Sequence, residues 1–349
     1  MITPEPIRPV TLPLPRSIDE VTAEWLGRIL TPAEPKAIEA IHVEMIGVGA
    51  GFMSDVARIR VVSPHADVPE SVVMKLAAEN PASRALAESF DSYRNESAFY
   101  RYLADEVPLR VPFCWSNQFD DGRFALLLED LGGLRRIDQI QGADRTSTMT
   151  CMAALGRLHS RFWNRPPASP ARYADSVEVV AGDYPKILPR VLERFDLPEP
   201  LAVWLRSVAE TYSQAARSHL AAPPTLVHID FRLDNLFFES TGEVVVADWG
   251  DHSIGPAAFD VAHFLATCLT IDDRRAWEEE ALASYHQALG DRVTESYDLS
   301  QCRADYVKML PGVFYIPAAL ATLETSSERG RAVARVSLER CAAAMTDHL

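Results

Sequence analysis

The sequence predicts an α+β protein of two lobes, in which an N-terminal antiparallel sheet carries one helix and the C-terminal lobe is mostly helical. Two patterns predict this class. Short β-branched runs crowd residues 40–130 around a single long helical segment. From residue 145 onward helical patterns dominate, and strand-like runs are confined to residues 225–251. The length of 349 residues agrees with two domains or with one large two-lobed protein.

The chain opens with elements that precede the sheet. Five prolines within residues 1–16 predict an extended arm, because proline lacks a backbone donor and breaks a regular helix. An amphipathic helical pattern covers residues 17–30, and Ser17 with Glu20 three positions later forms a candidate capping box. Three strands are then expected from β-branched runs, at residues 40–47, 55–62 and 71–77.

The remainder of the first lobe changes from helix back to strand. Residues 83–106 contain neither proline nor glycine and predict one long helix. Two more strands are expected at residues 113–120 and 123–130, joined by a turn. The order of three strands, one helix and two strands predicts an antiparallel sheet that carries one helix.

The second lobe is expected to begin near Gly132 and Gly133, which divides the chain into residues 1–131 and 132–349. Helical patterns then cover residues 145–164 and 197–220. Between them, prolines break the segment of residues 165–198. Short strands are expected at residues 225–230, 235–240 and 243–251, and helices again from residue 273 onward.

Composition excludes several classes of protein. The formal net charge is −15, and such a field repels nucleic acid and anionic membrane surfaces, so neither is expected as a partner. The five cysteines are odd in number and widely spaced, with no CxxC, which predicts reduced thiols in a cytoplasmic protein. The N-terminus lacks the apolar region of a signal peptide, and no apolar run approaches the roughly 18 residues of a membrane span. No obligate protein partner is evident.

Polar residues gather inside the apolar stretch "LVHIDFRLDNLFF". A hairpin-like layout would bring Asp230, Asn235 and Asp248 together at one edge. Two carboxylates and an amide oxygen suit Mg²⁺, and the carboxylate that is left over could orient or deprotonate a hydroxyl. Arg232 and Asp234 are interpreted as a local ion pair. A polar turn between two buried strands is the alternative, and spacing alone does not separate the two interpretations.

Two further features of the first lobe could bind a nucleotide. The turn "IGVGAGFMSDV" contains Gly47, Gly49 and Gly51, whose backbone could approach phosphate closely, although an ordinary hairpin gives the same pattern. Lys75 stands in the middle of an apolar strand, where a lysine is unusual unless it is paired. Glu96 is a candidate partner, and a solvated helix residue is the alternative.

These motifs in this order resemble a known fold. The glycine-rich turn, strand lysine, helix glutamate, "LLLEDL", H-x-D-x-x-x-x-N and D-W-G resemble the protein-kinase-like fold of the aminoglycoside phosphotransferases. "HIDFRLDN", "LGRLHSRFWN" and "DWGDHSIGPAAFDVAHFL" are similar to segments of that branch, and "LPLPRSIDEVTAEWLGRIL" is similar to its ecdysteroid-kinase-like subgroup. The resemblance covers roughly residues 12–349 and rests most firmly on H-x-D-x-x-x-x-N with D-W-G after it.

The resemblance implies an ATP-dependent phosphotransferase that uses Mg²⁺ and phosphorylates a hydroxyl of a small molecule. Asp230 would be the catalytic base or would orient the acceptor, with Arg232 in the same catalytic set, and Asn235 and Asp248 would hold Mg²⁺. His228 would bond backbone near D-W-G. Asp260 would brace the loop. The nucleotide-binding set of the N-terminal lobe would be Gly49, Gly51, Phe52, Met53, Ser54, Lys75, Glu96, Glu129 and Leu131.

Some residues depart from the resemblance. Ile229 stands where this branch usually has glycine, and Gly250 where a larger polar residue is common. Pro256 and Ala257 replace the usual aspartate–proline pair. These departures leave the lysine, the base and the metal residues in place, which argues against the alternative of a catalytically silent pseudokinase or scaffold. No A-P-E segment follows D-W-G, which argues against a protein kinase.

The acceptor is predicted only from composition. The segments expected to surround it are rich in aromatic residues, namely Tyr184, Trp204, Tyr285, Tyr306, Phe314 and Tyr315. Aromatic walls favour a hydrophobic alcohol, a hydroxy acid or its acyl thioester, or a sterol-like compound. An aminoglycoside-type antibiotic kinase is the alternative. It is less favoured, because a polycationic acceptor would require more carboxylates in those segments.

Overall fold

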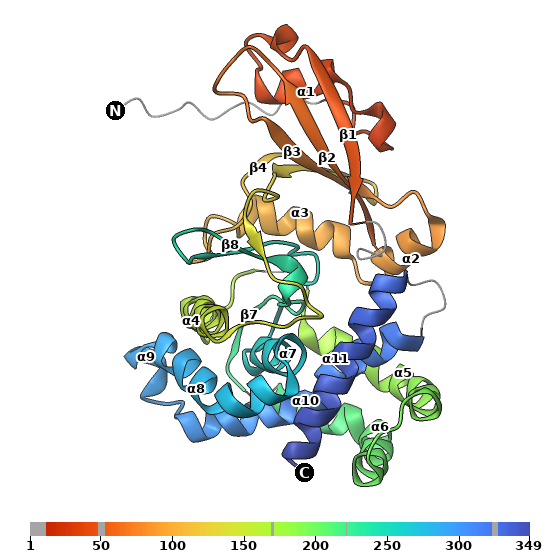
Figure 1. Cartoon of the computed structure of the whole chain (residues 1–349), viewed down its shortest axis with the longest axis vertical. Coiled ribbons are helices and arrows are strands. Elements are labelled where there is room, and N and C mark those ends of the chain that lie inside the picture. Colours follow the sequence, from red (N-terminus) through yellow and green to blue (C-terminus); the bar gives the residue numbers. More distant parts are fainter. Residues whose placement is uncertain (1–11, 48–52, 169–170, 221, 323–326) are drawn as a thin grey trace. The chain divides into compact units, whose positions relative to one another are not determined.

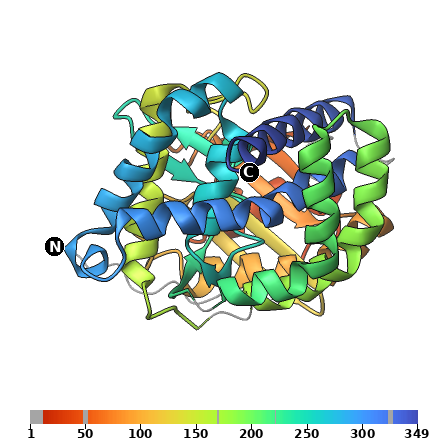
Figure 2. The same ribbon diagram turned by 90° about the horizontal axis from the view of Figure 1, so that it is seen from below.

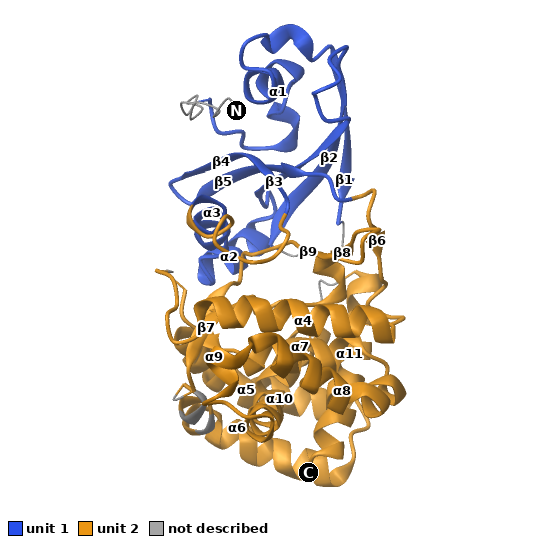
Figure 3. Cartoon of the chain, turned by 90° about the vertical axis from the view of Figure 1, so that its left-hand side faces the viewer, with its two compact units in different colours: residues 1–101, 112–131 blue, residues 102–111, 132–349 orange. Residues whose placement is uncertain are grey.

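The computed structural model describes residues 12–47, 53–168, 171–220, 222–322 and 327–349, and the chain forms two compact units. Unit 1 holds residues 1–101 and 112–131, and unit 2 holds residues 102–111 and 132–349 (Figure 1 and Figure 3). Residues 102–111, which the expected first domain includes, pack with unit 2. Arg110 explains this, because its carbonyl accepts from the N–H of Val246 at 2.9 Å.

Unit 1 contains the predicted antiparallel sheet, in the strand order β1-β2-β3-β5-β4. Its strands are β1 (Ala40–Ile46), β2 (Ser54–Val62), β3 (Ser71–Ala77), β4 (Cys114–Asp120) and β5 (Arg123–Glu129). Strand β3 alternates between its two faces, as a strand must. Val72, Met74 and Leu76 are buried with Trp25 and Leu26 of helix α1 (Ala23–Leu30). The side chain of Lys75 is therefore on the opposite face of the sheet.

The start of unit 1 differs from the expected capping box. A short 3₁₀ helix covers Ile18–Glu20, and Ser17 makes no side-chain capping bond. Helix α1 begins later, because the side chain of Thr22 accepts from the N–H of Trp25 at 3.1 Å. Residues 1–11 of the expected arm of residues 1–16 lie outside the described residues.

The single long helix expected over residues 83–106 was wrong. The structure has two helices, α2 (Pro81–Ser89) and α3 (Ser92–Tyr102), with the break at Asp91. Asp91 has a φ of 54°, which a regular right-handed helix does not permit. Aspartate is among the few residues that adopt this conformation readily, and the sequence pattern gave no other sign of the break.

Unit 2 is mostly helical, as predicted. Its helices are α4 (Arg145–Phe162), α5 (Tyr173–Arg194), α6 (Glu199–His219), α7 (Ala258–Cys268), α8 (Ile271–Leu289), α9 (Asp291–Thr294), α10 (Leu299–Thr322) and α11 (Glu328–Asp347). Helix α10 contacts α5, α6, α7, α8 and α11. Figure 2 shows it crossing the middle of the helical layer. The long buried side chains of this helix include Tyr306 and Phe314.

The segment expected to be broken by prolines is instead largely helical. Helix α5 runs for 22 residues and contains Pro185 and Pro189. The two prolines are four positions apart, so the backbone donors that they lack fall on one side of the helix. Val177, Tyr184 and Val191 pack inside the unit, and this burial offsets the missing bonds.

Two small sheets complete unit 2. Strand β7 (Pro224–Val227) pairs with β10 (Ser253–Pro256), and β8 (Leu236–Phe238) pairs with β9 (Val244–Val246) and β6 (Arg135–Arg136). The expected hairpin corresponds to β8 and β9. The expected strand of residues 225–230 was too long, since β7 ends at Val227 and pairs with β10 instead.

All five cysteines are free thiols, as predicted. Cys114 in β4 is half-buried, and the other four are buried in different helices of unit 2: Cys151 in α4, Cys268 in α7, Cys302 in α10 and Cys341 in α11. Burial raises the pKa of each thiol, to about 12 for Cys114 and Cys302. The thiols are therefore protonated at neutral pH.

Candidate active site

The polar stretch that follows β7 forms a loop of unit 2 held between buried apolar residues. Val227, Phe231 and Leu233 are fully buried. A 3₁₀ turn at Leu233–Asn235 then leads into β8. The apolar side chains fix the loop to the core, and Asp230, like Arg232, stays partly exposed, with a side chain about one fifth accessible. We call residues 228–235 the catalytic loop.

Asp260, at the start of α7, fixes the backbone of the catalytic loop. Its carboxylate is fully buried and accepts from the N–H groups of His228 at 2.7 Å and Ile229 at 2.8 Å. His159 donates to it from Nε2 at 3.3 Å. Burial raises the pKa of Asp260, but the hydrogen bond from His159, together with the contacts of His228, outweighs this effect and holds the pKa below its usual value. The predicted bracing contact of Asp260 is present.

Ile229 has an unusual backbone conformation. Its φ is 72°, in the left-handed region, which costs a non-glycine residue about 1–2 kcal/mol. Asp260 accepts from its N–H, and Nδ1 of His263 donates to its carbonyl at 2.7 Å. Both ends of the residue are thus bound by buried groups, which explains how a β-branched residue is held where glycine would be unstrained.

The side chains of the loop form an alternating charge network. Arg232 donates from Nε to Asp230 at 3.0 Å and from Nη1 to Asp234 at 3.0 Å. The predicted local ion pair between Arg232 and Asp234 is confirmed. Burial raises the pKa of Asp230, but the charge of Arg232 dominates the opposing effects and lowers the pKa to about 2. Asp230 is therefore ionised at neutral pH.

Asn235 and Asp248 lie at the same end of the β8–β9 hairpin. The carbonyl of Asn235 accepts from the N–H of Ala247 at 3.0 Å, which places Asn235 beside the residue preceding Asp248. The amide nitrogen of Asn235 donates to the carboxylate of Asp230 at 2.8 Å, so its amide oxygen can face a cation. Asp248 is exposed and has a φ of 64°. Among the described residues no group of three or more His, Cys, Asp or Glu could hold a metal, so protein ligands alone would be few.

His228 has the structural contact that was expected of it. Its side chain is buried, and Nε2 donates to the carbonyl of Ala247 at 3.1 Å. This bond ties the first residue of the catalytic loop to the segment that carries Asp248. His159 is a satisfied core histidine, as predicted, because the hydroxyl of Tyr285 donates to its Nδ1 at 2.9 Å.

Lys75 and Glu96 form an ion pair within unit 1. Nζ of Lys75 lies 2.7 Å from Oε2 of Glu96, and the two side chains are 12% and 3% exposed. Lys75 projects from the face of β3 opposite α1, and Glu96 projects from α3 on that side. A lysine held in this way presents a fixed positive charge, which suits the phosphates of a nucleotide.

The other residues predicted to bind the nucleotide are only partly within the described part of the chain, and the described ones differ in their contacts. Gly49, Gly51 and Phe52 lie outside the described residues. The carbonyl of Met53 accepts from the hydroxyl of Tyr93 at 2.5 Å, and Ser54 opens β2. Glu129 accepts from the N–H of Phe113 at 3.0 Å, and Leu131 is buried. The nucleotide-binding roles of these residues stay predictions.

The aromatic residues expected to line the acceptor site are mostly core residues. Tyr184, Tyr285, Tyr306 and Phe314 are at most 2% exposed. Only Trp204 and Tyr315 are partly accessible, and Tyr315 donates its hydroxyl to Asp183 at 2.9 Å. Alternating apolar patterns cannot distinguish a cavity wall from a packed core, so the composition of these segments does not identify the acceptor.

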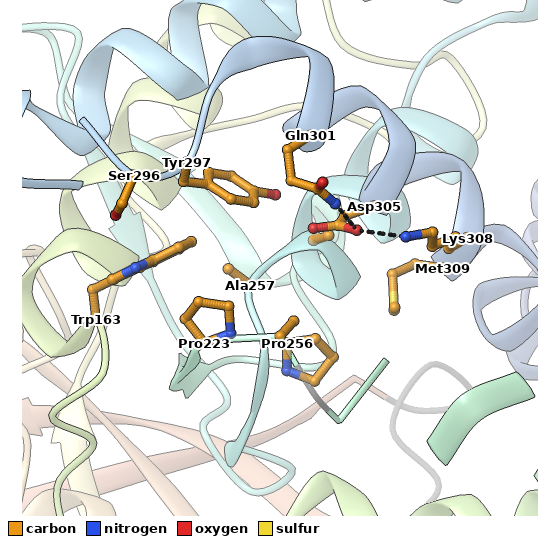
Figure 4. Close-up of a pocket in the computed structure, with 12 residues that line it drawn as sticks. Trp163, Pro223, Pro256, Ala257, Ser296, Tyr297, Gln301, Asp305, Lys308 and Met309 are labelled. Carbon is orange, nitrogen blue, oxygen red and sulfur yellow. Dashed lines mark hydrogen bonds and ion pairs between the residues drawn. The ribbon is translucent and has the colours of Figure 1, made fainter. Parts of the chain in front are cut away.

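Unit 2 also contains a pocket of about 330 Å³ (Figure 4). Trp163 and Tyr297 form one wall, with ring centroids 5.0 Å apart, and Asp305 accepts from Gln301 and Lys308 at 2.8 and 3.1 Å. The pocket lies at the Pro256 end of the β7–β10 pair, whereas the catalytic loop begins at the other end, after Val227. It is therefore separate from the catalytic loop.

The sequence of the chain matches a known protein family over most of its length. A model of the phosphotransferase enzyme family matches residues 60–298. The chain belongs to this family. The match includes Lys75, Glu96 and the whole catalytic loop. The expected family is confirmed, and its description agrees with the expected phosphotransferase.

Solved structures share the fold. A *Plasmodium vivax* ethanolamine kinase is 11% identical with a TM-score of 0.55, covering 91% of this chain and 85% of that one. A choline kinase from *Cryptosporidium parvum* is 11% identical with a TM-score of 0.56, covering 86% and 88%. An aminoglycoside 2′-phosphotransferase IIIa mutant with GDP is 13% identical with a TM-score of 0.55, covering 94% and 97%. The predicted kinase-like fold is confirmed.

One curated relative is longer than this chain. It is an uncharacterized oxidoreductase, dhs-27, from *Caenorhabditis elegans*, 23% identical over 325 residues. The alignment covers 81% of this chain but only 39% of the relative, so the chain spans about two fifths of that protein.

None of the helices in the described part of the chain combines the length and the hydropathy that a membrane crossing requires.

Proposed function

We propose that this phosphotransferase transfers the γ-phosphoryl group of ATP to a hydroxyl group of a small molecule. Asp230 is the residue that would bind and orient this hydroxyl group. The observation that carries the proposal is the arrangement of the catalytic loop. Asp230 is ionised and partly exposed, and it is fixed by hydrogen bonds from both Arg232 and Asn235. A fixed carboxylate beside an amide ligand is what in-line phosphoryl transfer requires of a protein.

The low pKa of Asp230 decides how it would act. A carboxylate with a pKa of about 2 is a weak base and would not deprotonate a free alcohol before reaction. Its first role would be to accept a hydrogen bond from the hydroxyl and so to aim the oxygen at the γ-phosphorus. As the new O–P bond forms and the bond to ADP breaks, the hydroxyl becomes acidic and its proton passes to Asp230. Arg232 keeps Asp230 ionised and correctly oriented until then.

Mg²⁺ fits the residues at the end of the β8–β9 hairpin. Asn235 offers an amide oxygen and Asp248 an exposed carboxylate, and Mg²⁺ commonly takes one or two such ligands together with phosphate oxygens. When bound, the ion would neutralise negative charge on the phosphates. Asn235 would have two roles, because its amide nitrogen also orients Asp230.

Unit 1 would bind the nucleotide. Lys75 would contact phosphate oxygens, and Glu96 would keep its side chain in one place. Met53 and Ser54, with Gly49, Gly51 and Phe52, would cover the phosphates, and the backbone of Glu129 to Leu131 would meet the base. These roles rest on the family assignment and on the ion pair.

The acceptor remains a proposal at the level of class. The solved structures with this fold are named as kinases of ethanolamine, choline and aminoglycosides, which are hydroxyl compounds that carry amines. The sequence analysis expects instead a hydrophobic alcohol, a hydroxy acid or acyl thioester, or a sterol-like compound, but most of the aromatic residues behind this expectation are core residues. A panel that contains both groups separates them directly.

The test measures ADP release from Mg·ATP against this panel, with Asp230→Asn beside the wild type. We expect acceptor-dependent release that Asp230→Asn lowers by about 10²–10⁴-fold, because the variant cannot take the proton. The matched control is Asp298→Asn, the same change at an exposed position of unit 2, which should leave turnover unchanged.

Nucleotide binding is measured separately by melting temperature. Mg·ATP should raise the melting temperature of the wild type and of Asp230→Asn, since a ligand that binds only the native state stabilises it. Asp248→Ala should lose most of this increase, because it removes the proposed carboxylate ligand of Mg²⁺. Wild-type turnover in Asp230→Asn would refute the assigned role of Asp230.

A further inference from the structure

The C-terminal helix α11 is bound to the catalytic loop at its first turn. Ser327 caps the helix by accepting from the N–H of Gly330 at 3.0 Å. Arg329, the second residue of the helix, donates from Nη2 to Oδ1 of Asp234 at 3.1 Å. It also donates from Nη1 to Oδ2 of Asp138 at 3.3 Å. One guanidinium group therefore joins α11, the catalytic loop and the segment before α4.

The contact of Arg329 continues a chain of alternating charges that ends at Asp230. Arg329 holds one oxygen of Asp234, and Arg232 holds the other at 3.0 Å. Arg232 in turn holds Asp230 at 3.0 Å. The order of charges is Asp138, Arg329, Asp234, Arg232 and Asp230. Three carboxylates are thus bridged by two guanidinium groups, and each guanidinium lies between two carboxylates.

Exposure separates this network from an ordinary surface ion pair. A single exposed pair contributes little to stability, because water screens it. Arg329 is 42% exposed, but the side chain of Asp234 is only 9% exposed and those of Arg232 and Asp230 are 22% and 23% exposed. A carboxylate as buried as Asp234 depends strongly on its counter-charges.

A second contact of α11 supports the backbone of the loop. Arg340, which is 6% exposed, donates to the carbonyls of Gln139 and Ile140, both at 2.7 Å. The side chain of Gln139 then accepts from the N–H of Leu233 in the catalytic loop at 3.0 Å. The segment of residues 138–140 is thus held by α11 through both arginines, and it holds the loop in turn.

We propose that Arg329 is a positioning residue for phosphoryl transfer, which fixes Asp234 so that Arg232 presents Asp230 to the acceptor. This inference rests on the proposed function, because it concerns the same carboxylate. Arg329 itself touches neither Asp230 nor any residue proposed to bind Mg²⁺, and it acts through two intervening side chains.

Loss of the guanidinium would change how Arg232 is shared. Asp234 would then depend on Arg232 alone. The net charge around Arg232 would be more negative by one unit, and Arg232 would be attracted to two carboxylates at once. A displacement of about 1 Å at a reacting group can cost about 10²-fold in turnover. Binding of the nucleotide through Lys75 would be unaffected, so the loss should fall on kcat and not on KM for ATP.

The experiment uses the full chain with three substitutions. Arg329→Gln removes the charge, and Arg329→Lys keeps it with a shorter reach. Arg335→Gln is the matched control, since Arg335 lies six residues further along the same helix and pairs on the surface with Glu339 at 2.9 Å. We expect Arg329→Gln to lower kcat by about tenfold or more and to change KM for ATP by less than about threefold. Arg329→Lys should recover part of the loss, and Arg335→Gln should match the wild type.

Amide hydrogen exchange gives a measurement that does not depend on turnover. The peptide that covers residues 226–238 should exchange faster in Arg329→Gln than in Arg335→Gln, because the loop has lost a contact. If the wild type phosphorylates no acceptor, the proposed function is refuted and exchange alone decides about Arg329. Equal exchange of this peptide in Arg329→Gln and Arg335→Gln, or equal kcat values of these two variants, would overturn the inference. If Arg329→Gln fails to fold, Arg329→Lys takes its place in the same comparison.

Discussion

Replacing Asp260 by asparagine should damage both the stability of unit 2 and its turnover. The two oxygens of Asp260 accept from two successive backbone N–H groups, those of His228 and Ile229. Asparagine has one oxygen and one NH₂ group, so one of the two N–H groups would face another donor. The substitution also removes the charge that His159 contacts.

The expected cost follows from these contacts. Hydrogen bonds to a charged group contribute about 1.5–3 kcal/mol, and a buried donor that is left without an acceptor costs about 1–3 kcal/mol. We therefore expect Asp260→Asn to lower the free energy of unfolding by about 3–5 kcal/mol, in the upper range of single substitutions. Where the N–H of Ile229 is the group that loses its acceptor, the left-handed residue is no longer held at that end, so the loop can relax from its native path and turnover falls as well.

Urea denaturation followed by circular dichroism measures the loss, and ADP release measures turnover on the folded fraction. The control is Asp305→Asn, another nearly buried aspartate of unit 2, whose carboxylate is bound by side chains, namely those of Gln301, Lys308 and Tyr297. It should cost less than about 1.5 kcal/mol. A loss under about 1 kcal/mol for Asp260→Asn, with turnover intact, would refute the bracing role of Asp260.

Two further outcomes concern a buried ion pair and a buried imidazole. Lys75→Met should lower the free energy of unfolding by about 3 kcal/mol, because it removes the counter-charge of the buried Glu96. Adding Glu96→Leu should restore much of the lost stability. Strictly additive losses of the two substitutions in urea denaturation would contradict this coupling. Burial lowers the pKa of His252 from 6.5 to about 4, so the unfolded chain binds a proton first as the pH falls. The contribution of His252 to stability should be complete above pH 6.5, decline by about 3 kcal/mol down to pH 4 and then stay constant. His252→Gln should flatten this interval, and an unchanged pH profile would show that the imidazole is not responsible.

The sequence predicted the parts of the fold that depend on local pattern. The alternation of β3 places Lys75 opposite the face that packs on α1, and the same alternation is visible in the sequence. The catalytic loop was recognisable because Asp230 and Asn235 lie within one short segment. The ion pair between Lys75 and Glu96 was predictable as a contact, since an apolar strand cannot leave a lysine unbalanced.

Other features depend on contacts that local pattern does not contain. The break at Asp91 was missed because one left-handed residue interrupts an otherwise continuous helical pattern. Helix α5 was missed because burial of Tyr184 and Val191 outweighs two prolines. The contacts of Gln139 with Leu233 and of Arg329 with Asp234 join residues 94 and 95 positions apart, and no spacing rule indicates them.

The distribution of the cysteines gives unit 2 a set of built-in reporters. Cys151, Cys268, Cys302 and Cys341 belong to four different helices, and each is buried as a protonated thiol. An alkylating reagent reacts with the thiolate, so it can modify each of them only after that helix has opened to solvent. The rate at which each thiol is alkylated therefore records how often its own helix opens. These four helices can therefore be ranked by local stability in the natural sequence, without introducing a reporter residue.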